Sequence, residues 1–267
     1  MAEGINSSLK IVDKYCADFI QGSIKFKEAL AFAEQLVEGK LYLVGSFLYG
    51  NLLGHYGYNP QHFFATPLDL EKVDVDFLAA KIKPEYPLIK DYKINDWRLL
   101  DAHDSIINPD DCGYTIKETL NLNPNARTLR FKGPNFKVDL ISLESYANEL
   151  AEEAVGLSNS WEEMRLQSYL NEVPFTVQSI YYDIQKGKVE GATGLSALEK
   201  KLVKVNNYHS ALHTAKNKKT TVKKLLLEKA GWLGFSVPES GMMEICGLEE
   251  RGGLSVYESE FDRKGNY

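Results

Sequence analysis

The stretch "LVGSFLYGNLLG" at residues 43–54, with "VDVDF" at residues 73–77, decides the expected fold. Residues 41–44 are a short apolar run that predicts a strand, and a helix is expected from Gly45 until Gly54 ends it. "VDVDF" alternates strictly between apolar and acidic residues, which predicts a second strand. Because alternate residues of a strand share a face, Asp74 and Asp76 are expected on the face opposite the valines.

The two neighbouring carboxylates call for a cation. Two carboxylates about 4 Å apart repel by about 4 kcal/mol at an effective dielectric constant near 20. A hard, oxygen-preferring ion such as Mg²⁺, or Mn²⁺ in its place, would relieve that repulsion. Asp139 lies in "FKVDLISL" at residues 136–143, a further expected strand, and is a third candidate ligand. Three carboxylates on neighbouring strands can hold two metal ions for phosphoryl transfer.

Each motif also has a purely structural interpretation. An Asp-x-Asp pair is often only the solvent face of a half-buried strand. Gly45 and Ser46 favour a backbone that binds phosphate at a helix N-terminus, but Ser46 can equally act as a helix cap. The ordered combination of strand, Gly-Ser, helix, strand with Asp-x-Asp and later strand with Asp is the stronger signal.

Composition sets the outer limits. The chain has 267 residues, a net charge of −6 and three cysteines, an odd number that favours a reducing compartment over a disulfide framework. No apolar run is long enough to cross a bilayer, and the N-terminus lacks the apolar core of a signal peptide. The expectation is a cytoplasmic protein without a membrane partner.

Coarse patterns predict the remaining elements. Helices are expected at 9–20 and 26–37, and "RTLRF" and "FKVDLISL" should pair as a hairpin around "KGPN" at 132–135. Residues 81–125 are interpreted as an insertion with short helices. Further helices are expected at 144–170, in "FTVQSIYYD" at 175–183, and around 195–202 and 216–230. The last thirty residues are expected to form a loose tail.

In this order, the motifs resemble those of the DNA polymerase β-type nucleotidyltransferase superfamily. The likeness is greatest to the head domain of bacterial poly(A) polymerases and CCA-adding enzymes. The segments that carry it span residues 41–235 and are "VGSFLYGNLLG", "DVDF", "FKVDLISLESY", "PFTVQSIYYD", "GKVEGATGLSALEKKLVKV" and "KKLLLEKAGWLGF".

The resemblance implies an α/β (α+β) fold, a mixed sheet flanked by helices with a small helical C-terminal extension. It implies a catalytic core at residues 1–145 that includes the N-terminal helices and the insertion at about 81–125. A head-to-neck helical region at 146–235 and a C-terminal tail at 236–267 would follow.

The resemblance also implies a site. Asp74, Asp76 and Asp139 would be the catalytic metal ligands for Mg²⁺ or Mn²⁺. The nucleotide would be bound by residues at four positions, Gly45, Ser46, Thr176 and Gln178. The expected partners are an NTP and an RNA acceptor, and a protein partner stays open.

The chain departs from the family pattern at several positions. Tyr49 and Gly50 replace an Arg-Asp pair, residues 172–174 (Glu-Val-Pro) replace Arg-Arg-Asp, Gln178 replaces Asn, and Glu144 replaces Arg. The sequence also ends just after the expected neck, and the neck motif that selects C and A is not found. The departures suggest a different acceptor or nucleotide preference.

Three hypotheses follow from this pattern. The first is a metal-dependent nucleotidyltransferase acting on RNA. The second is a catalytically inactive, nucleotidyltransferase-like RNA-binding or assembly subunit. The third is an enzyme that modifies a protein or small molecule.

Basic and aromatic residues add weaker indications. The lysines between 216 and 229 form either a phosphate contact or a solvated helix face. Of Arg127 and Arg130, three positions apart on a strand, at most one can meet a triphosphate. His209 and His213 are interpreted as surface residues, and Tyr181 and Tyr182 as core or base-stacking residues.

Overall fold

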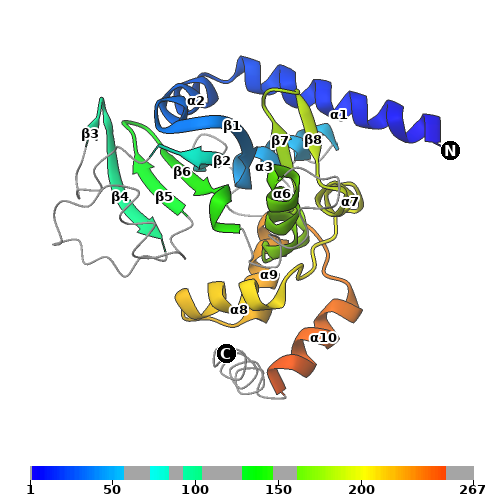
Figure 1. Ribbon diagram of the computed structural model, residues 1–267. Coiled ribbons are helices and arrows are strands. Elements are labelled where there is room, and N and C mark those ends of the chain that lie inside the picture. Colours follow the sequence, from blue (N-terminus) through cyan, green and yellow to red (C-terminus); the bar gives the residue numbers. More distant parts are fainter. Residues whose placement is uncertain (1, 57–72, 84–92, 104–127, 147–160, 251–267) are drawn as a thin grey trace.

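A mixed sheet of eight strands organises the part of the chain that the structure describes. The computed structural model describes residues 2–56, 73–83, 93–103, 128–146 and 161–250 (Figure 1). The strand order is β3-β4-β5-β6-β2-β1-β7-β8, and only β2 and β6 run parallel to each other. The predicted α/β fold with a mixed sheet and flanking helices is confirmed.

The strands are β1 (Val37–Val44), β2 (Val75–Ile82), β3 (Lys93–Ile94), β4 (Trp97–His103), β5 (Thr128–Lys132), β6 (Lys137–Ser142), β7 (Tyr181–Asp183) and β8 (Lys188–Glu190). The α-helices of the described residues are α1 (Ala2–Gly22), α2 (Ile24–Leu36), α3 (Gly45–His55), α6 (Trp161–Glu172), α7 (Ala192–Lys200), α8 (Tyr208–Asn217), α9 (Val222–Leu233) and α10 (Glu239–Glu250). Two short 3-10 helices, η2 (Leu143–Tyr146) and η4 (Thr176–Gln178), complete them.

The two faces of the sheet pack differently. On one face, the main core joins Val75 and Phe77 of β2 to residues of α1, α2 and α3. On the other face, a smaller cluster joins Leu78 of β2 to Tyr169 and Leu170 of α6. Because side chains alternate along a strand, Asp76 lies on the α6 face. Its neighbours Val75 and Phe77 are fully buried on the opposite face.

Helix α3 starts directly at the end of strand β1. Gly45 has a φ of +72°, a left-handed conformation that glycine adopts without steric cost and that turns the chain sharply from strand into helix. Phe47, Leu48 and Leu52 of α3 are buried in the main core, which fixes the helix against the sheet. The first turn of α3 is therefore held next to the start of β2.

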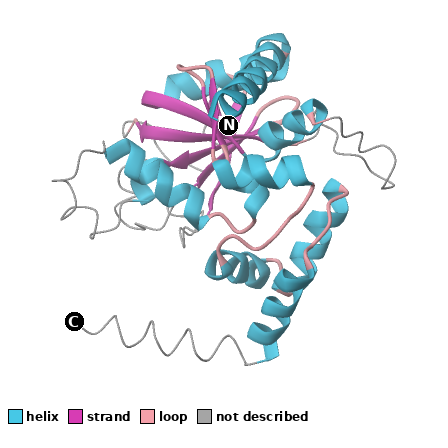
Figure 2. Ribbon diagram, turned by 90° about the vertical axis from the view of Figure 1, so that its right-hand side faces the viewer, coloured by secondary structure: helices cyan, strands magenta, loops and turns pink. Residues whose placement is uncertain are grey.

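Helices α8, α9 and α10 lie below the sheet as drawn, with α1 above it (Figures 1 and 2). The N-cap side chain of Thr221 accepts a hydrogen bond from Lys224 N–H, and Gly234 ends α9 in the left-handed conformation. Among the described residues, no helix is both long and apolar enough to cross a membrane.

Several sequence-based predictions are confirmed. The expected hairpin is formed by β5 and β6, and helices occur near each of the predicted ranges 9–20, 26–37, 195–202 and 216–230. Within the predicted 144–170 helix, α6 begins only at Trp161, and residues 147–160 lie outside the described residues. The proposed division at residues 145 and 235 stays a prediction.

Two predictions are wrong in the described residues, and a third is tested only in part. Of the interval 81–125, residues 93–103 contribute strands β3 and β4, in which Trp97 and Leu99 are buried, whereas residues 84–92 and 104–127 lie outside the described residues. Residues 175–183 form η4 and strand β7 rather than a helix, because Tyr182 pairs with Leu43 of β1. The C-terminal segment includes α10, whose Ile245 is buried, whereas residues 251–267 lie outside the described residues.

Candidate functional site

The strand register brings two of the three predicted acidic residues into one row, whereas Asp74 precedes the first residue of β2. Asp76 of β2 lies opposite Asp139 of β6, and Asp139 lies opposite Arg130 of β5. Residues directly opposite each other in a ladder place their side chains on the same face. Two carboxylates and one guanidinium thus follow one another across three strands on the α6 face.

The carboxylate of Asp76 lies at the N-terminus of α3. It accepts a hydrogen bond from the backbone N–H of Ser46. A Cβ atom added at Gly45 would overlap this carboxylate, so the close approach requires glycine at that position. The backbone N–H groups and the dipole of the helix N-terminus favour an anion here. Asp76 and the Gly45–Ser46 turn therefore form one unit.

Burial raises the pKa of the Asp76 carboxyl well above its ordinary value, and the nearby carboxylates of Asp139 and Asp74 raise it further. Arg130 and the Ser46 N–H act in the opposite direction. The pKa of the Arg130 guanidinium is raised, mainly because it donates hydrogen bonds to Asp139. At Asp76, the repulsion from Asp139 and Asp74 is therefore larger than the attraction to Arg130.

This electrostatic strain predicts an unusual pH dependence of stability. An acid whose pKa is higher in the folded than in the unfolded state makes the fold less stable as pH rises above its unfolded pKa. In the presence of a chelator, the contribution of Asp76 should therefore decrease from about pH 4 upward. The groups facing it are Asp74, Asp139, Arg130 and the buried phenol of Tyr169 on α6.

The check is urea unfolding of the wild type and of Asp76→Asn at pH 5 and pH 8 in EDTA. The asparagine variant is expected to gain stability relative to the wild type, and to gain more at pH 8 than at pH 5. Equal gains at both pH values would contradict a raised pKa of Asp76 in the folded protein.

The carboxylate oxygens at this row are suitable ligands for a divalent cation that binds few protein groups. Mg²⁺ commonly binds one or two carboxylates and completes its octahedron with water and substrate phosphates. Asp74 and Asp76 offer such a pair, because Asp74 is close enough for its charge to raise the pKa of the Asp76 carboxyl, in addition to burial and Asp139. Within the described ranges, no group of three His, Cys, Asp or Glu side chains is arranged to hold a metal ion.

Asp139 differs from the other two carboxylates because it is already paired. Its Oδ1 accepts a hydrogen bond from Arg130 Nε at 2.8 Å, and its Oδ2 accepts one from Arg130 Nη2 at 2.5 Å. Arg130 was assigned from sequence to a possible triphosphate contact. Arg127, the other candidate, lies outside the described residues.

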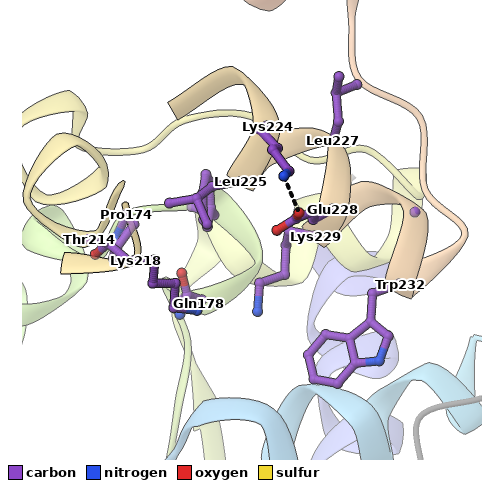
Figure 3. A pocket seen from close by; sticks show the side chains of 12 residues that line it. Pro174, Gln178, Thr214, Lys218, Lys224, Leu225, Leu227, Glu228, Lys229 and Trp232 are labelled. Atoms are coloured by element: carbon purple, nitrogen blue, oxygen red, sulfur yellow. Dashed lines mark ion pairs between the residues drawn. The ribbon is translucent and has the colours of Figure 1, made fainter. Parts of the chain in front are cut away.

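A cavity of about 850 Å³ lies between η4, α8 and α9 (Figure 3). Its lining combines basic, aromatic and amide side chains, with lysines and Trp232 from the two helices and Gln178 from η4. The lining includes Phe175, Gln178, Lys218, Lys224, Lys229 and Trp232. The Oε1 atom of Gln178 is buried and has no hydrogen-bond partner within the described part of the chain.

A chain of contacts links this cavity to the carboxylate row. Lys229 Nζ donates a hydrogen bond to the Tyr49 hydroxyl at 3.0 Å. That hydroxyl and Ser46 Oγ are 2.7 Å apart, and the Ser46 backbone N–H binds Asp76. The ammonium of Lys229 also lies 5.0 Å from the Trp232 ring centroid, a cation–π contact. One side chain of α9 thus reaches the N-terminal turn of α3.

The structure separates the four residues predicted to bind nucleotide. Gly45 and Ser46 form the turn beside Asp76, and Gln178 lines the cavity. The hydroxyl of Thr176 instead accepts a hydrogen bond from Lys204 N–H, and Thr176 is not among the cavity-lining residues. The role of all four in nucleotide binding stays a prediction.

Sequence reasoning missed the contribution of Tyr49 and Lys229. Tyr49 was noted only as a departure from the arginine of the family motif, and Lys229 only as one lysine of a basic stretch. Because the two residues are 180 positions apart, no local pattern signals their contact. The spacing of Lys229 and Trp232 on one helix was the available signal for a shared face.

Comparisons with known proteins add the following findings. No protein-family model matches the chain, and no curated protein matches it. Among solved structures, a tRNA-processing enzyme with CTP is 17% identical with a TM-score of 0.44, and the match covers 84% of this chain and 46% of that one. A tRNA nucleotidyltransferase complexed with a primer tRNA and an incoming ATP analog is 15% identical with a TM-score of 0.41, covering 84% and 49%.

A third match is the Bacillus stearothermophilus CCA-adding enzyme in complex with CTP, 13% identical with a TM-score of 0.35, covering 77% of this chain and 38% of that one. The chain therefore spans less than half the length of these structures.

Proposed function

We propose that this chain is a metal-dependent nucleotidyltransferase that transfers a nucleotide from an NTP to an acceptor hydroxyl, with RNA as the acceptor. The observation that carries the proposal is the carboxylate of Asp76 at the N-terminal turn of α3, with Asp139 opposite it in the sheet and Asp74 close enough to influence its pKa. Acidic oxygen ligands beside a helix N-terminus are suited to an ion and a phosphate together.

In the proposed reaction, the acceptor hydroxyl oxygen forms a bond to the α-phosphorus of the NTP. The bond from that phosphorus to the bridging oxygen breaks, pyrophosphate leaves, and the hydroxyl proton passes to solvent or a nearby carboxylate. A Mg²⁺ or Mn²⁺ ion, held by Asp74 and Asp76, would supply charge stabilisation to the phosphates. Asp139 would complete the side of the site that activates the acceptor hydroxyl.

The cavity beside α9 is the proposed nucleotide pocket. Its volume of about 850 Å³ lies within the range of about 300–1,000 Å³ typical of small-molecule sites. Lys218, Lys224 and Lys229 would attract the polyphosphate. Phe175 and Trp232 offer faces for a base, and the unpartnered Oε1 of Gln178 can accept a hydrogen bond from a base amino group.

The RNA assignment has the support of the lysines of α8, α9 and their connection. These side chains would neutralise backbone phosphates, which makes binding strongly dependent on salt. The matched solved structures are themselves described as tRNA-processing enzymes or tRNA nucleotidyltransferases. An RNA acceptor should therefore show weaker binding as salt is raised from 50 to 200 mM.

Label transfer tests the function directly. The protein is incubated with Mg²⁺ or Mn²⁺, each NTP labelled at the α-phosphate in turn, and a mixture of cellular RNA and protein. The expected result is label in RNA that is absent with an Asp74→Ala/Asp76→Ala variant. Label found in protein would instead identify a protein acceptor. No label with any nucleotide would contradict the proposed enzymatic activity.

A second candidate is a catalytically inactive, nucleotidyltransferase-like subunit that binds RNA or helps an assembly. The bidentate ion pair between Arg130 and Asp139 favours it, because both oxygens of the third carboxylate are occupied. Salt-dependent RNA binding without label transfer from any NTP would support this candidate.

Replacing Lys229 with methionine is expected to weaken NTP binding about tenfold while leaving the fold intact. Methionine keeps the apolar stem but removes the charge that reaches Tyr49 and the cavity, and a hydrogen bond to a charged group contributes about 1.5–3 kcal/mol. The measurement is NTP affinity by calorimetry. Lys200→Met, at an exposed lysine of α7, is the matched control and should bind as the wild type does. Equal affinity of both variants would remove Lys229 from the pocket.

A further inference from the structure

The residue that distinguishes this carboxylate row is Arg130. Its guanidinium binds both oxygens of Asp139 in the parallel, two-bond arrangement that gives Arg–carboxylate pairs their strength and fixed orientation. The side chain of Asp139 is 9% exposed and that of Arg130 is 28% exposed, so water screens the pair only partly. The attraction of Arg130 extends to Asp74 and Asp76 as well.

The charges of the row and of the nearby Asp74 determine how many cations this site accommodates. Asp74, Asp76 and Asp139 carry three negative charges when ionised, and Arg130 carries one permanent positive charge. The remaining charge of about −2 matches a single divalent cation. A second divalent cation would have to approach the guanidinium and displace or distort its hydrogen bonds to Asp139, which would cost the buried carboxylate its partner.

We infer that Arg130 takes the place of a second metal ion, so that this protein binds one divalent cation, at Asp74 and Asp76. Asp139 is then a partner of Arg130 and not a metal ligand in the protein without nucleotide. This inference rests on the proposed function for the presence of a cation at the row. It makes Arg130 the residue that sets the metal stoichiometry.

The backbone of the β5–β6 hairpin fixes the relative position of Arg130 and Asp139. Arg130 lies directly opposite Asp139 in the β5–β6 hairpin, so the short connection at 133–136 fixes the two side chains on the same face. Neighbouring residues of the hairpin, Leu129 and Leu140, are also directly opposite each other and are buried in the main core. A shift of register that would release the pair would also expose this core.

The test is a titration with Mn²⁺, in which the paramagnetic resonance signal of free Mn²⁺ gives the number of bound ions per chain. The wild type is expected to bind one ion, and the Asp74→Ala/Asp76→Ala variant none. Arg130→Gln is expected to bind a second ion, with an affinity at least tenfold above any second site of the wild type. Arg130→Lys retains the charge and should stay near one ion. Lys132→Gln, an exposed position on the same strand, is the control for loss of a positive charge.

Two ions bound to the wild-type chain would overturn the inference, whether or not Arg130→Gln folds. One ion in both the wild type and a folded Arg130→Gln would overturn it as well. No Mn²⁺ bound by any variant would overturn both this inference and the metal site of the proposed function. One ion bound without label transfer from any NTP would refute the proposed activity and leave the role of Arg130 standing.

Discussion

Asp76→Asn is expected to lower nucleotide transfer by roughly 1000-fold or more while the fold persists. The substitution removes one of the two proposed ligands of the catalytic ion, which would stabilise the transition state by several kcal/mol, and about 4 kcal/mol corresponds to roughly 1000-fold in rate. Asparagine can still accept the hydrogen bond from Ser46 N–H, so the N-terminal turn of α3 should stay in place. The measurement is single-turnover label transfer at saturating Mg²⁺ and NTP.

The matched control is Asp96→Asn, the same chemical change at an exposed turn between β3 and β4. This variant should transfer label at the wild-type rate. Thermal unfolding in EDTA separates loss of chemistry from loss of structure, because removing the repulsion at Asp76 should keep or raise the midpoint. Transfer by Asp76→Asn within tenfold of the wild type would place the chemistry elsewhere in the molecule.

Gly45→Ala is expected to cause a large loss of stability together with a loss of metal affinity. The φ of +72° costs a residue with a Cβ about 1–2 kcal/mol, and the new methyl group would overlap the Asp76 carboxylate. We expect a total loss of at least about 3 kcal/mol, a decrease in the unfolding midpoint of about 6–12 °C for a chain of this size. Relief of the overlap also requires Asp76 to move, so Mn²⁺ affinity should fall too.

Gly22→Ala provides the comparison, because a Cβ at this glycine near the end of α1 meets no atom within 4 Å. Alanine is favoured over glycine in helices by up to about 1 kcal/mol, so this variant should be as stable as the wild type or slightly more stable. Calorimetric unfolding of both variants, with Mn²⁺ titration of whichever remains folded, gives the answer. A Gly45→Ala protein with unchanged midpoint and Mn²⁺ affinity would show that the turn and Asp76 are not coupled.

The acidic row shows which features of the site local sequence patterns can predict. Alternation in "VDVDF" predicted the faces of Val75, Asp76 and Phe77, and the structure confirms them. The hairpin turn at 132–135 predicted the β5–β6 pairing that places Arg130 opposite Asp139, although the ion pair itself was not anticipated. By contrast, "FTVQSIYYD" has no decisive period, and its final strand pairs with both β1 and β8.

By itself, the sequence determined the strand faces, the Gly45 turn and the candidate carboxylates, because these depend on the geometry of neighbouring residues. Only the tertiary structure decided that Asp76 lies opposite Asp139, because the register of strands β2 and β6, which are distant in the sequence, is set by packing of the whole sheet. The same holds for Lys229 and Tyr49, whose contact spans 180 positions and depends on how α9 packs against α3. Local patterns supply the acidic residues and the hairpin that carries Arg130, whereas the pairing of Asp76 with Asp139 and the contact of Lys229 with Tyr49 come from distant segments that folding brings together.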